Sequence, residues 1–204
     1  MSAASPRSRT FLGRLKALYP ASLILLGIAA AFPAAARDFD PAPQDPSFTE
    51  YDIKAVFLYH FTQYLRWPED IEPDVFTIVV FGDSDIIAPL REIAKKKTVG
   101  LKPIVIRQCF EIGQIGRPRI LFLAKSALSG IAQVLEKTRG TDILTIGEAE
   151  GLGSRGVAVN FVLREGTVKF EVSEKALKEA RIQTSSQLLR LAILVDGDKG
   201  RSER

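Results

Sequence analysis

The sequence predicts one three-layer α/β domain with a mixed, largely parallel sheet and a C-terminal β-hairpin plus helices. Between residues 51 and 146, short apolar runs of strand length alternate with amphipathic stretches of helix length, which is typical of an α/β domain with parallel strands. A hairpin pattern follows over residues 157–172, and apolar residues then recur at helical spacing as far as Val195. The hairpin adds an antiparallel pair and makes the sheet mixed.

The first 36 residues predict a secretory signal peptide. They contain no acidic residue, an apolar run of about ten residues at 23–32, and small residues that favour cleavage after Ala36. Their basic residues are Arg7, Arg9, Arg14 and Lys16. The alternative is an N-terminal membrane anchor, but a span needs about twenty apolar residues. We therefore expect an exported product.

Composition also divides the remainder of the chain. Residues 37–48 are rich in proline and are expected to form a linker. Residues 49–196 are expected to form the folded domain, and residues 197–204 are expected to form a flexible charged tail.

The charge balance argues against a nucleic-acid partner. The chain has 28 Lys and Arg against 24 Asp and Glu. Loss of the four basic leader residues leaves 24 of each, a net charge of zero. A nucleic-acid-binding protein needs a basic excess on its folded part, so we expect no nucleic-acid partner.

The first helix is expected at residues 51–67. Ile53, Phe57 and Phe61 share one face, Thr49 is a candidate N-cap, and a proline at 68 ends the helix. We interpret the aromatic residues as cover for one sheet face rather than as a cofactor-stacking site, because no polar group is organised around them. His60, the single histidine, is interpreted as an ordinary helix residue.

Four apolar runs predict buried strands, and two amphipathic stretches predict the helices between them. The strands are expected at residues 75–81, 103–107, 119–123 and 142–146, and the helices at 86–97 and 128–137. Lysines at 95–97 end the first of these helices, where cations interact well with the helix dipole. We interpret them as a solvated helix end rather than a binding patch.

The segment 147–156 is rich in glycine and charge but lacks the features of a phosphate-binding loop. No G-K-[ST] sequence is present, and the segment joins two strands, so no helix N-terminus faces it. We interpret it as a mobile surface connection.

The expected hairpin joins residues 157–163 to residues 167–172 through Arg164, Glu165 and Gly166. The first strand is almost wholly apolar and is expected to be covered on both faces, whereas the second alternates and lies nearer an edge.

Two helices are expected after the hairpin. Ser173 is a candidate N-cap for the first. Thr184 and Gln187 have capping-box spacing for the second, which we expect to reach Val195.

Cys109 is the only cysteine, so no internal disulfide can form. It either packs as a small buried hydrophobe or forms an intermolecular bond. Its place at the end of a predicted strand favours burial.

Several segments resemble the YfiR family in their order and spacing. They are residues 53–59 (IKAVFLY) with Trp67 and Pro68, residues 120–122 (ILF), residues 143–145 (ILT), Asn160 with Phe161, residues 168–172 (VKFEV) and residues 185–192 (SSQLLRLA). The resemblance covers Tyr51 to Val195. It implies an exported, periplasmic α/β domain with no catalytic residue, no metal and no cofactor.

The resemblance also implies a regulatory role and a set of partners. The expected partner is the periplasmic domain of a membrane-bound signalling protein, most directly a diguanylate cyclase, whose output the protein represses. An outer-membrane lipoprotein antagonist and a homodimer are further expected assemblies. Members similar to the namesake carry several cysteines, whereas only Cys109 is present here, so redox control is not expected.

Two other functional classes are alternatives to a regulator. A small-ligand sensor would use a pocket at the strand ends of the sheet. An enzyme would need a triad, metal-ligand spacing or paired carboxylates, and no such motif stands out. The candidate partner-binding or ligand-binding residues are Arg155, Asn160, Lys169 and Arg190.

Overall fold

The structure is a computed structural model that describes residues 48–68 and 74–195. The predicted signal peptide, most of the predicted linker and the predicted charged tail lie outside the described residues.

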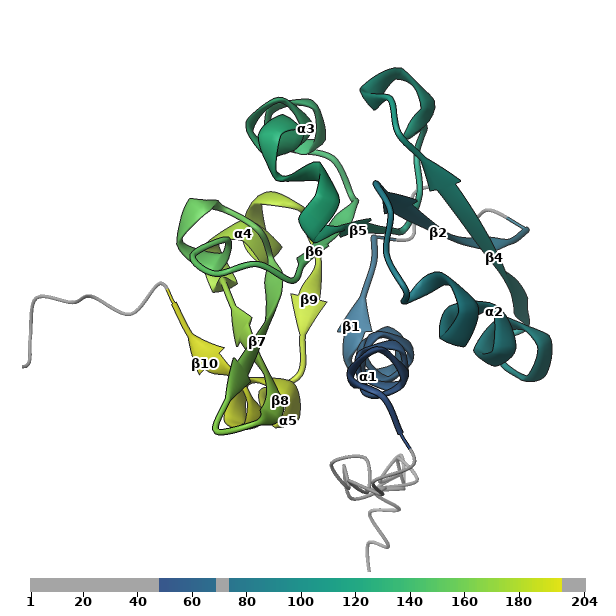
Figure 1. Cartoon of the computed structure of the whole chain (residues 1–204), viewed down its shortest axis with the longest axis horizontal. Helices are drawn as coiled ribbons and strands as arrows, with labels where there is room; N and C mark the ends of the chain where they lie inside the picture. Colours follow the sequence, from purple (N-terminus) through teal and green to yellow (C-terminus); the bar gives the residue numbers. More distant parts are fainter. Residues whose placement is uncertain (1–47, 69–73, 196–204) are drawn as a thin grey trace, which may run out of the picture. The chain divides into compact units, whose positions relative to one another are not determined.

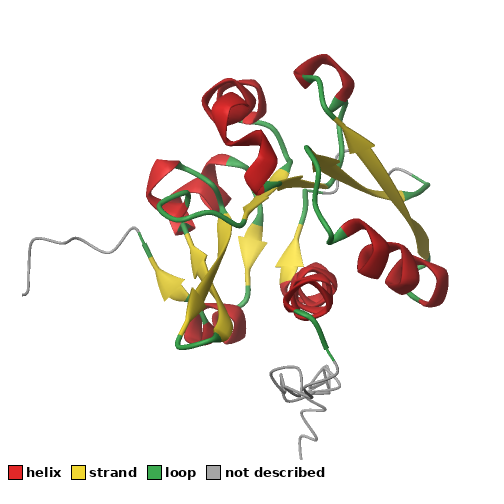
Figure 2. Cartoon of the chain, in the orientation of Figure 1, coloured by secondary structure: helices red, strands yellow, loops and turns green. Residues whose placement is uncertain are grey.

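Helices and strands alternate along the described chain, as the sequence predicts (Figure 2). The strands are β1 (Leu65–Arg66), β2 (Phe76–Phe81), β3 (Thr98–Val99), β4 (Lys102–Cys109), β5 (Ile120–Leu123), β6 (Leu144–Gly147), β7 (Val159–Arg164), β8 (Thr167–Val172), β9 (Gln183–Thr184) and β10 (Ile193–Leu194). The α-helices are α1 (Glu50–Tyr64), α2 (Ile87–Lys96), α3 (Ile131–Thr138), α4 (Glu174–Glu179) and α5 (Ser186–Leu191), with 3₁₀ turns η1 (Ile112–Gln114), η2 (Lys125–Gly130) and η3 (Gly153–Arg155).

The main sheet has eight strands in the order β10-β8-β7-β6-β5-β2-β4-β3. Its central neighbours, from β4 across to β7, are all parallel, whereas β7–β8 and β3–β4 are antiparallel. The sheet is therefore mixed and largely parallel, and the predicted fold class is confirmed. Helices α1 and α2 lie on one side of the sheet and α3 lies on the other (Figure 1).

Aromatic side chains join α1 to the hairpin strands. Phe57 and Phe61 of α1 contact Phe161 of β7 and Phe170 of β8, with ring centroids 5.0 Å apart for Phe61–Phe170 and 5.8 Å apart for Phe61–Phe161. All four side chains are buried. The predicted role of these aromatic residues as cover for a sheet face is confirmed, because burial of large rings is a strong driving force for packing.

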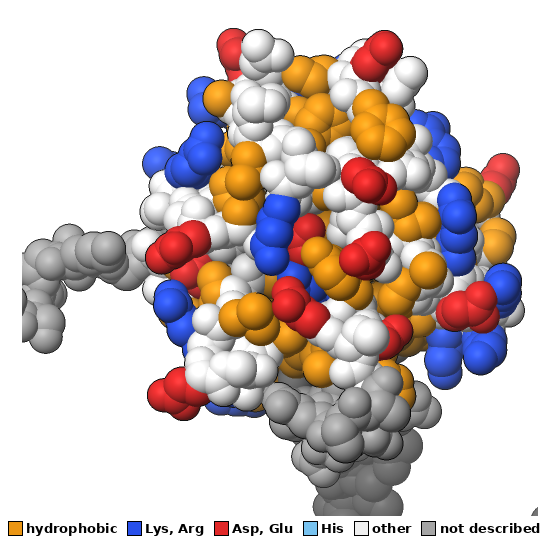
Figure 3. Space-filling view, viewed as in Figure 1, with side chains coloured by type: hydrophobic (Ala, Val, Ile, Leu, Met, Phe, Trp, Pro, Cys, Tyr) orange, Lys and Arg blue, Asp and Glu red, His pale blue; other side chains and the backbone are white. Residues whose placement is uncertain are grey.

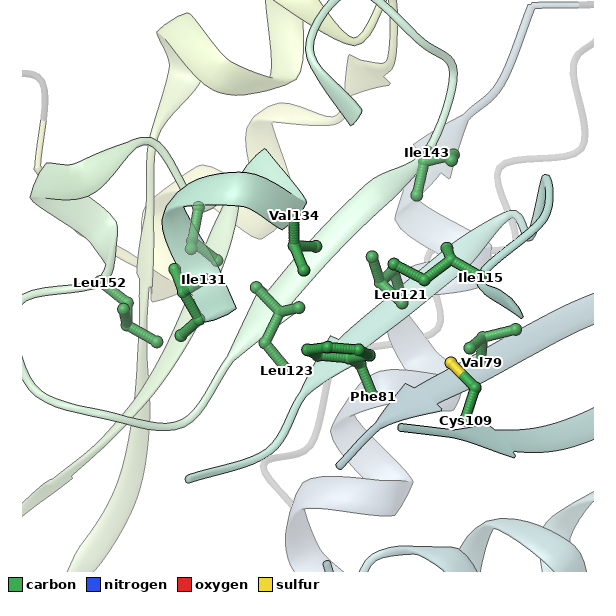
Figure 4. Close-up of a cluster of buried hydrophobic side chains, with 11 residues drawn as sticks. Val79, Phe81, Cys109, Ile115, Leu121, Leu123, Ile131, Val134, Ile143 and Leu152 are labelled. Atoms are coloured by element: carbon green, nitrogen blue, oxygen red, sulfur yellow. The ribbon is translucent and has the colours of Figure 1, made fainter. Parts of the chain in front are cut away.

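A second buried cluster lies between the sheet and α3 (Figure 4). Leu121 and Leu123 of β5 pack with Ile131 and Val134 of α3, and all four side chains are buried. Cys109 lies at one end of this cluster and is 3% exposed, and burial raises the pKa of its thiol. The prediction of a buried Cys109 is confirmed.

Helix α1 begins where the sequence predicts but ends earlier. Thr49 is the N-cap, and its side chain forms a capping box with Asp52. The helix ends at Tyr64 rather than at the predicted Trp67, because β1 pairs with the distant strand β9. The Tyr64 carbonyl also accepts a hydrogen bond from the Ser185 amide at 3.0 Å.

The hairpin is confirmed, with a tighter turn than expected. Arg164 pairs with Thr167, which leaves only Glu165 and Gly166 in the loop, with φ values of 52° and 74°. Positive φ at both positions is the signature of a type I′ turn, whose twist matches that of the strands.

The last predicted helix is too long. Helix α5 ends at Leu191, and β10 then pairs in parallel with β8, with Ile193 opposite Glu171. The Val195 amide donates to the Val172 carbonyl at 3.1 Å. Sheet pairing therefore overrides the helical spacing that predicted continuation to Val195.

We predict that Phe61→Ala lowers the free energy of unfolding by ~3–5 kcal/mol. The substitution leaves a cavity among the aromatic rings, and the neighbouring side chains cannot move far enough to fill it. Urea unfolding followed by circular dichroism measures the change. Leu101→Ala is the matched control, because Leu101 is 99% exposed. A Phe61→Ala midpoint equal to that of the control would contradict the aromatic core described here.

Candidate functional site

Parallel strands place three polar groups at one edge of the sheet. Glu148 directly follows β6, Ser84 lies in the connection after β2, and Lys125 opens η2 after β5. Carboxyl ends of parallel strands meet at one edge, where ligands bind in many α/β proteins. Glu148 Oε1 accepts hydrogen bonds from the Ser84 hydroxyl at 3.5 Å and from the Lys125 amide at 3.3 Å.

A lysine from α1 completes this cluster. Lys54 Nζ lies 2.7 Å from Glu148 Oε2 and 2.5 Å from Glu50 Oε1. The side chains of Lys54 and Glu148 are only 3% and 1% exposed. The Lys54 ammonium also lies 4.7 Å from the centre of the Tyr51 ring, within the range of a cation–π interaction. A buried ion pair thus fixes α1 to the edge of the sheet.

The electrostatics of the cluster favour the charged pair. Burial alone would lower the pKa of Lys54, but hydrogen bonds from its ammonium to Glu148 and Glu50 and their negative charge outweigh burial and raise it. Burial and the nearby Glu148 carboxylate raise the pKa of Tyr51. Lys54 is therefore held as a cation, which makes it a poor general base.

The crevice between β2 and β5, where the strand order reverses, is closed by the protein itself. The Ser126 hydroxyl accepts from the Asp83 amide at 2.7 Å and donates to the Asp83 carbonyl at 2.9 Å. Gly82 has φ +96°, and a Cβ there would lie 2.7 Å from Ser126 Oγ. The connections after β2 and β5 are therefore bound to each other where many α/β domains admit a ligand.

An open cleft of about 370 Å³ lies beside the buried ion pair. Its lining combines apolar side chains with charges of both signs, among them Glu50, Lys125, Leu128, Glu150, Leu163 and Arg164. Leu128 and Leu163 are 39% and 49% exposed. Figure 3 shows charged side chains of both signs interleaved with apolar ones on the face viewed. The cleft thus places two partly exposed leucines among charged side chains.

Sequence reasoning missed Lys54 and Glu148. A signal was present, because Lys54 lies three and seven residues before Phe57 and Phe61, on the apolar stripe of a helix. The segment 147–156 was interpreted as a surface connection, which is wrong for Glu148 and Leu152, since both side chains are buried.

The four residues predicted from sequence do not form one site. Asn160 is fully buried, and its Nδ2 donates to the Ala149 carbonyl at 3.0 Å and to Glu171 Oε2 at 2.9 Å. Arg155 in η3, Lys169 on β8 and Arg190 on α5 are exposed.

Arg155 does line a second groove, of about 460 Å³. The groove is polar, and Arg139, Arg155, Lys175 and Glu179 contribute its charged side chains. Three cations against one carboxylate favour an anionic occupant.

Other site types find no support among the described residues. Within residues 48–68 and 74–195, no group of His, Cys, Asp and Glu side chains could hold a metal ion. None of the helices in these ranges is long and apolar enough to cross a membrane. His60 is half-buried on α1, and burial and the nearby Lys97 lower its pKa.

Comparison with known proteins identifies a family and several distant structural neighbours. The family model described as YfiR/HmsC-like matches residues 51–193. No curated protein matches the sequence.

An ABC domain in complex with L-Trp from Streptococcus pneumoniae is 12% identical, with a TM-score of 0.45 over 62% of this chain and 57% of that one. A conserved domain protein from Vibrio cholerae is also 12% identical, with a TM-score of 0.46 over 72% of this chain and 60% of that chain. The chain thus covers less than two thirds of either neighbour.

We predict that Lys54→Met lowers the free energy of unfolding by ~3–5 kcal/mol, because it leaves the Glu148 carboxylate buried without its cation. Lys54→Met/Glu148→Gln should recover at least half of this loss. Denaturant titration measures both. Lys95→Met is the control, since it removes a salt bridge at the surface. The side chains of Lys95 and Glu92 in that salt bridge are 67% and 59% exposed. Equal effects of Lys54→Met and Lys95→Met would refute a structural role for the buried pair.

The pair also gives stability a pH dependence. The folded pKa of Lys54 is raised, so its stabilisation is complete below the ordinary value of 10.5 and is lost as pH rises through the folded value. The raised pKa of Tyr51 acts in the same direction, so the comparison uses a Tyr51→Phe background. In that background, unfolding midpoints above pH 10.5 should fall more steeply for the protein that retains Lys54 than for the Lys54→Met variant. If the unfolding midpoints of the two proteins fell equally steeply with pH, the raised pKa of Lys54 would be contradicted.

Proposed function

Because the chain belongs to the YfiR/HmsC-like family, we propose that it is a periplasmic regulator of a membrane-bound diguanylate cyclase. It binds the exported part of that enzyme and lowers its output of cyclic-di-GMP. The observation that carries the proposal is the family match, which spans residues 51–193 and therefore nearly all of the described domain.

The geometry supports binding rather than catalysis. The buried charged side chains among the described residues, Lys54 and Glu148, bind each other, and a neutralised pair offers no free acid or base. By contrast, the cleft beside them presents partly exposed leucines among charges of both signs. Exposed apolar residues surrounded by polar ones are suited to a protein partner.

Export is part of the proposal. The basic, acid-free leader and the small residues before position 37 support cleavage after Ala36. The product then has a proline-rich linker, the domain at 49–196 and a charged tail. Following the family resemblance, we also propose that an outer-membrane lipoprotein relieves the repression.

A second candidate function is a sensor for a small anion. The groove that holds Arg139, Arg155 and Lys175 supports it, because convergent cations recognise carboxylate or phosphate groups. Arg155 is the predicted candidate residue that this groove contains. The two functions are compatible, since a bound anion could alter the affinity for a protein partner.

We predict that deletion of the gene raises cellular cyclic-di-GMP and surface attachment, because repression of the cyclase is lost. Export-competent protein should reverse both changes, and its intact mass should be that of residues 37–204. Protein without residues 1–36 is the matched control and should restore neither. Unchanged cyclic-di-GMP after deletion would refute the cyclase-regulator proposal.

For the sensor candidate, we predict that an anionic metabolite remains bound to the purified protein in native mass spectrometry. Arg155→Ala should reduce its occupancy about tenfold or more, because a charge-assisted hydrogen bond is lost. Arg190→Ala is the control, as Arg190 is exposed on α5 and lies outside the groove. Absence of any bound anion, or equal loss in both variants, would exclude this function.

A further inference from the structure

The sheet ends on one side in a strand with an open edge. Strand β4 pairs along its length with β2 on one side, but on the other side β3 pairs only with Lys102 and Pro103. No other described strand pairs with β4. Beyond the pair with β3, residues 105–109 therefore have an unpaired main-chain edge within the described structure.

The direction of the unpaired groups follows from the neighbouring strands. The Cys109 carbonyl accepts from the Gly82 amide at 2.9 Å, so the main chain of Cys109 faces β2. Main-chain groups of successive residues in a strand point to opposite sides. Val105 and Arg107 therefore also face β2, whereas Ile104, Ile106 and Gln108 direct their main-chain groups away from it. Because Pro103 has no N–H, its pairing with Thr98 requires the Ile104 amide to donate to the Lys97 carbonyl. The unpaired outward amides are therefore those of Ile106 and Gln108.

Two apolar side chains are exposed along this edge, which also carries the exposed polar side chains of Arg107 and Gln108. Val105 is 37% exposed, and Phe110, directly after the strand, is 65% exposed. An exposed strand edge with apolar side chains accepts an extended segment from another chain, which gains main-chain hydrogen bonds and side-chain contacts together.

The charge of the side chains around β4 indicates which kind of extended segment would bind there. Between residues 91 and 109, the only acidic residue is Glu92, whose carboxylate is paired with Lys95 at 2.5 Å. The basic residues of this stretch are Arg91, Lys95, Lys96, Lys97, Lys102 and Arg107. Helix α2 packs on β4, and Figure 3 shows basic side chains gathered on the side of the molecule where α2 and β4 lie. The lysines at 95–97, interpreted from sequence as a solvated helix end, thus flank the open edge.

We propose that the edge of β4 is a docking site for an extended, acidic segment of a protein partner, which adds to the sheet as a further strand. This inference rests on the proposed function and names the surface and the partner chemistry. A second copy of the chain is disfavoured, because pairing two β4 edges would bring these two basic clusters together.

Amide hydrogen exchange measured by NMR tests the site with a short synthetic peptide that alternates Val and Glu. In the free protein, the amides of Ile106 and Gln108 should exchange rapidly, whereas those of Ile104, Val105 and Arg107 should be protected. The peptide should slow exchange at Ile106 and Gln108 by about tenfold or more. A peptide that alternates Val and Lys is the control and should have no effect.

Two variants separate main-chain docking from charge. Ile106→Pro removes an outward N–H, a change that edge strands tolerate, and should weaken binding of the Glu peptide about fivefold or more. Lys97→Glu/Arg107→Glu should reverse the preference, so that the Lys peptide binds instead. Lys125→Glu/Arg164→Glu, placed on the cleft beside Glu148, should leave binding unchanged.

Several results would overturn the proposal. The first is protection of the Ile106 and Gln108 amides in the free monomer. The second is a dimer that Ile106→Pro dissociates in sedimentation, and the third is equal binding of both peptides. The test is independent of the cyclase. If the deletion strain shows raised cyclic-di-GMP but Ile106→Pro and Lys97→Glu/Arg107→Glu both restore repression fully, the docking site fails and the proposed function stands. If the peptide binds as described while deletion changes nothing, the docking site stands and the proposed function fails.

Discussion

The buried contact between Lys54 and Glu148 constrains the arrangement of the domain. The two residues lie 94 positions apart, and their charged atoms meet at 2.7 Å with almost no exposure to solvent. Leaving either charge unpaired in that environment would be strongly unfavourable. Helix α1 must therefore lie with its first turns at the carboxyl edge of β6. That position also directs Phe57 and Phe61 onto the rings of β7 and β8.

The sheet has a region closed by polar contacts and a separate, accessible edge. Near Glu148, polar groups of three strand ends bind one another, and Ser126 and Asp83 close the crevice between β2 and β5. At β4, by contrast, the sheet ends with main-chain groups directed outward and basic side chains beside them. A rigid scaffold with an accessible edge is well suited to binding a polypeptide, because little ordering accompanies association.

Local patterns in the sequence were sufficient for the fold class and for the order of the α-helices and the longer strands, but not for the two-residue strands. The start of α1 was predictable because the capping box of Thr49 and Asp52 lies within one turn of helix. The end of α1 was not, because it depends on pairing with β9, about 120 positions away. For the same reason, β10 was hidden within an apparently helical spacing.

The candidate site was less predictable than the fold. Glu148 becomes informative only when Lys54 is placed beside it, and that contact depends on the complete tertiary structure. Of the residues selected from sequence, Asn160 supports the structure by joining the loop at Ala149 to Glu171. The open edge of β4 likewise has no sequence signature, because it depends on which strands fail to cover it.

Photocrosslinking in living cells tests the central claim most directly, namely that the domain acts by contact with the exported part of a membrane signalling protein. A photoreactive amino acid at position 105 and another at position 163 sample the β4 edge and the cleft, since Val105 and Leu163 are both exposed. Mass spectrometry then identifies each adduct. The account predicts an adduct with a membrane protein that carries a cytoplasmic cyclase domain. Exported protein that forms adducts at neither position, or only with itself, would contradict it.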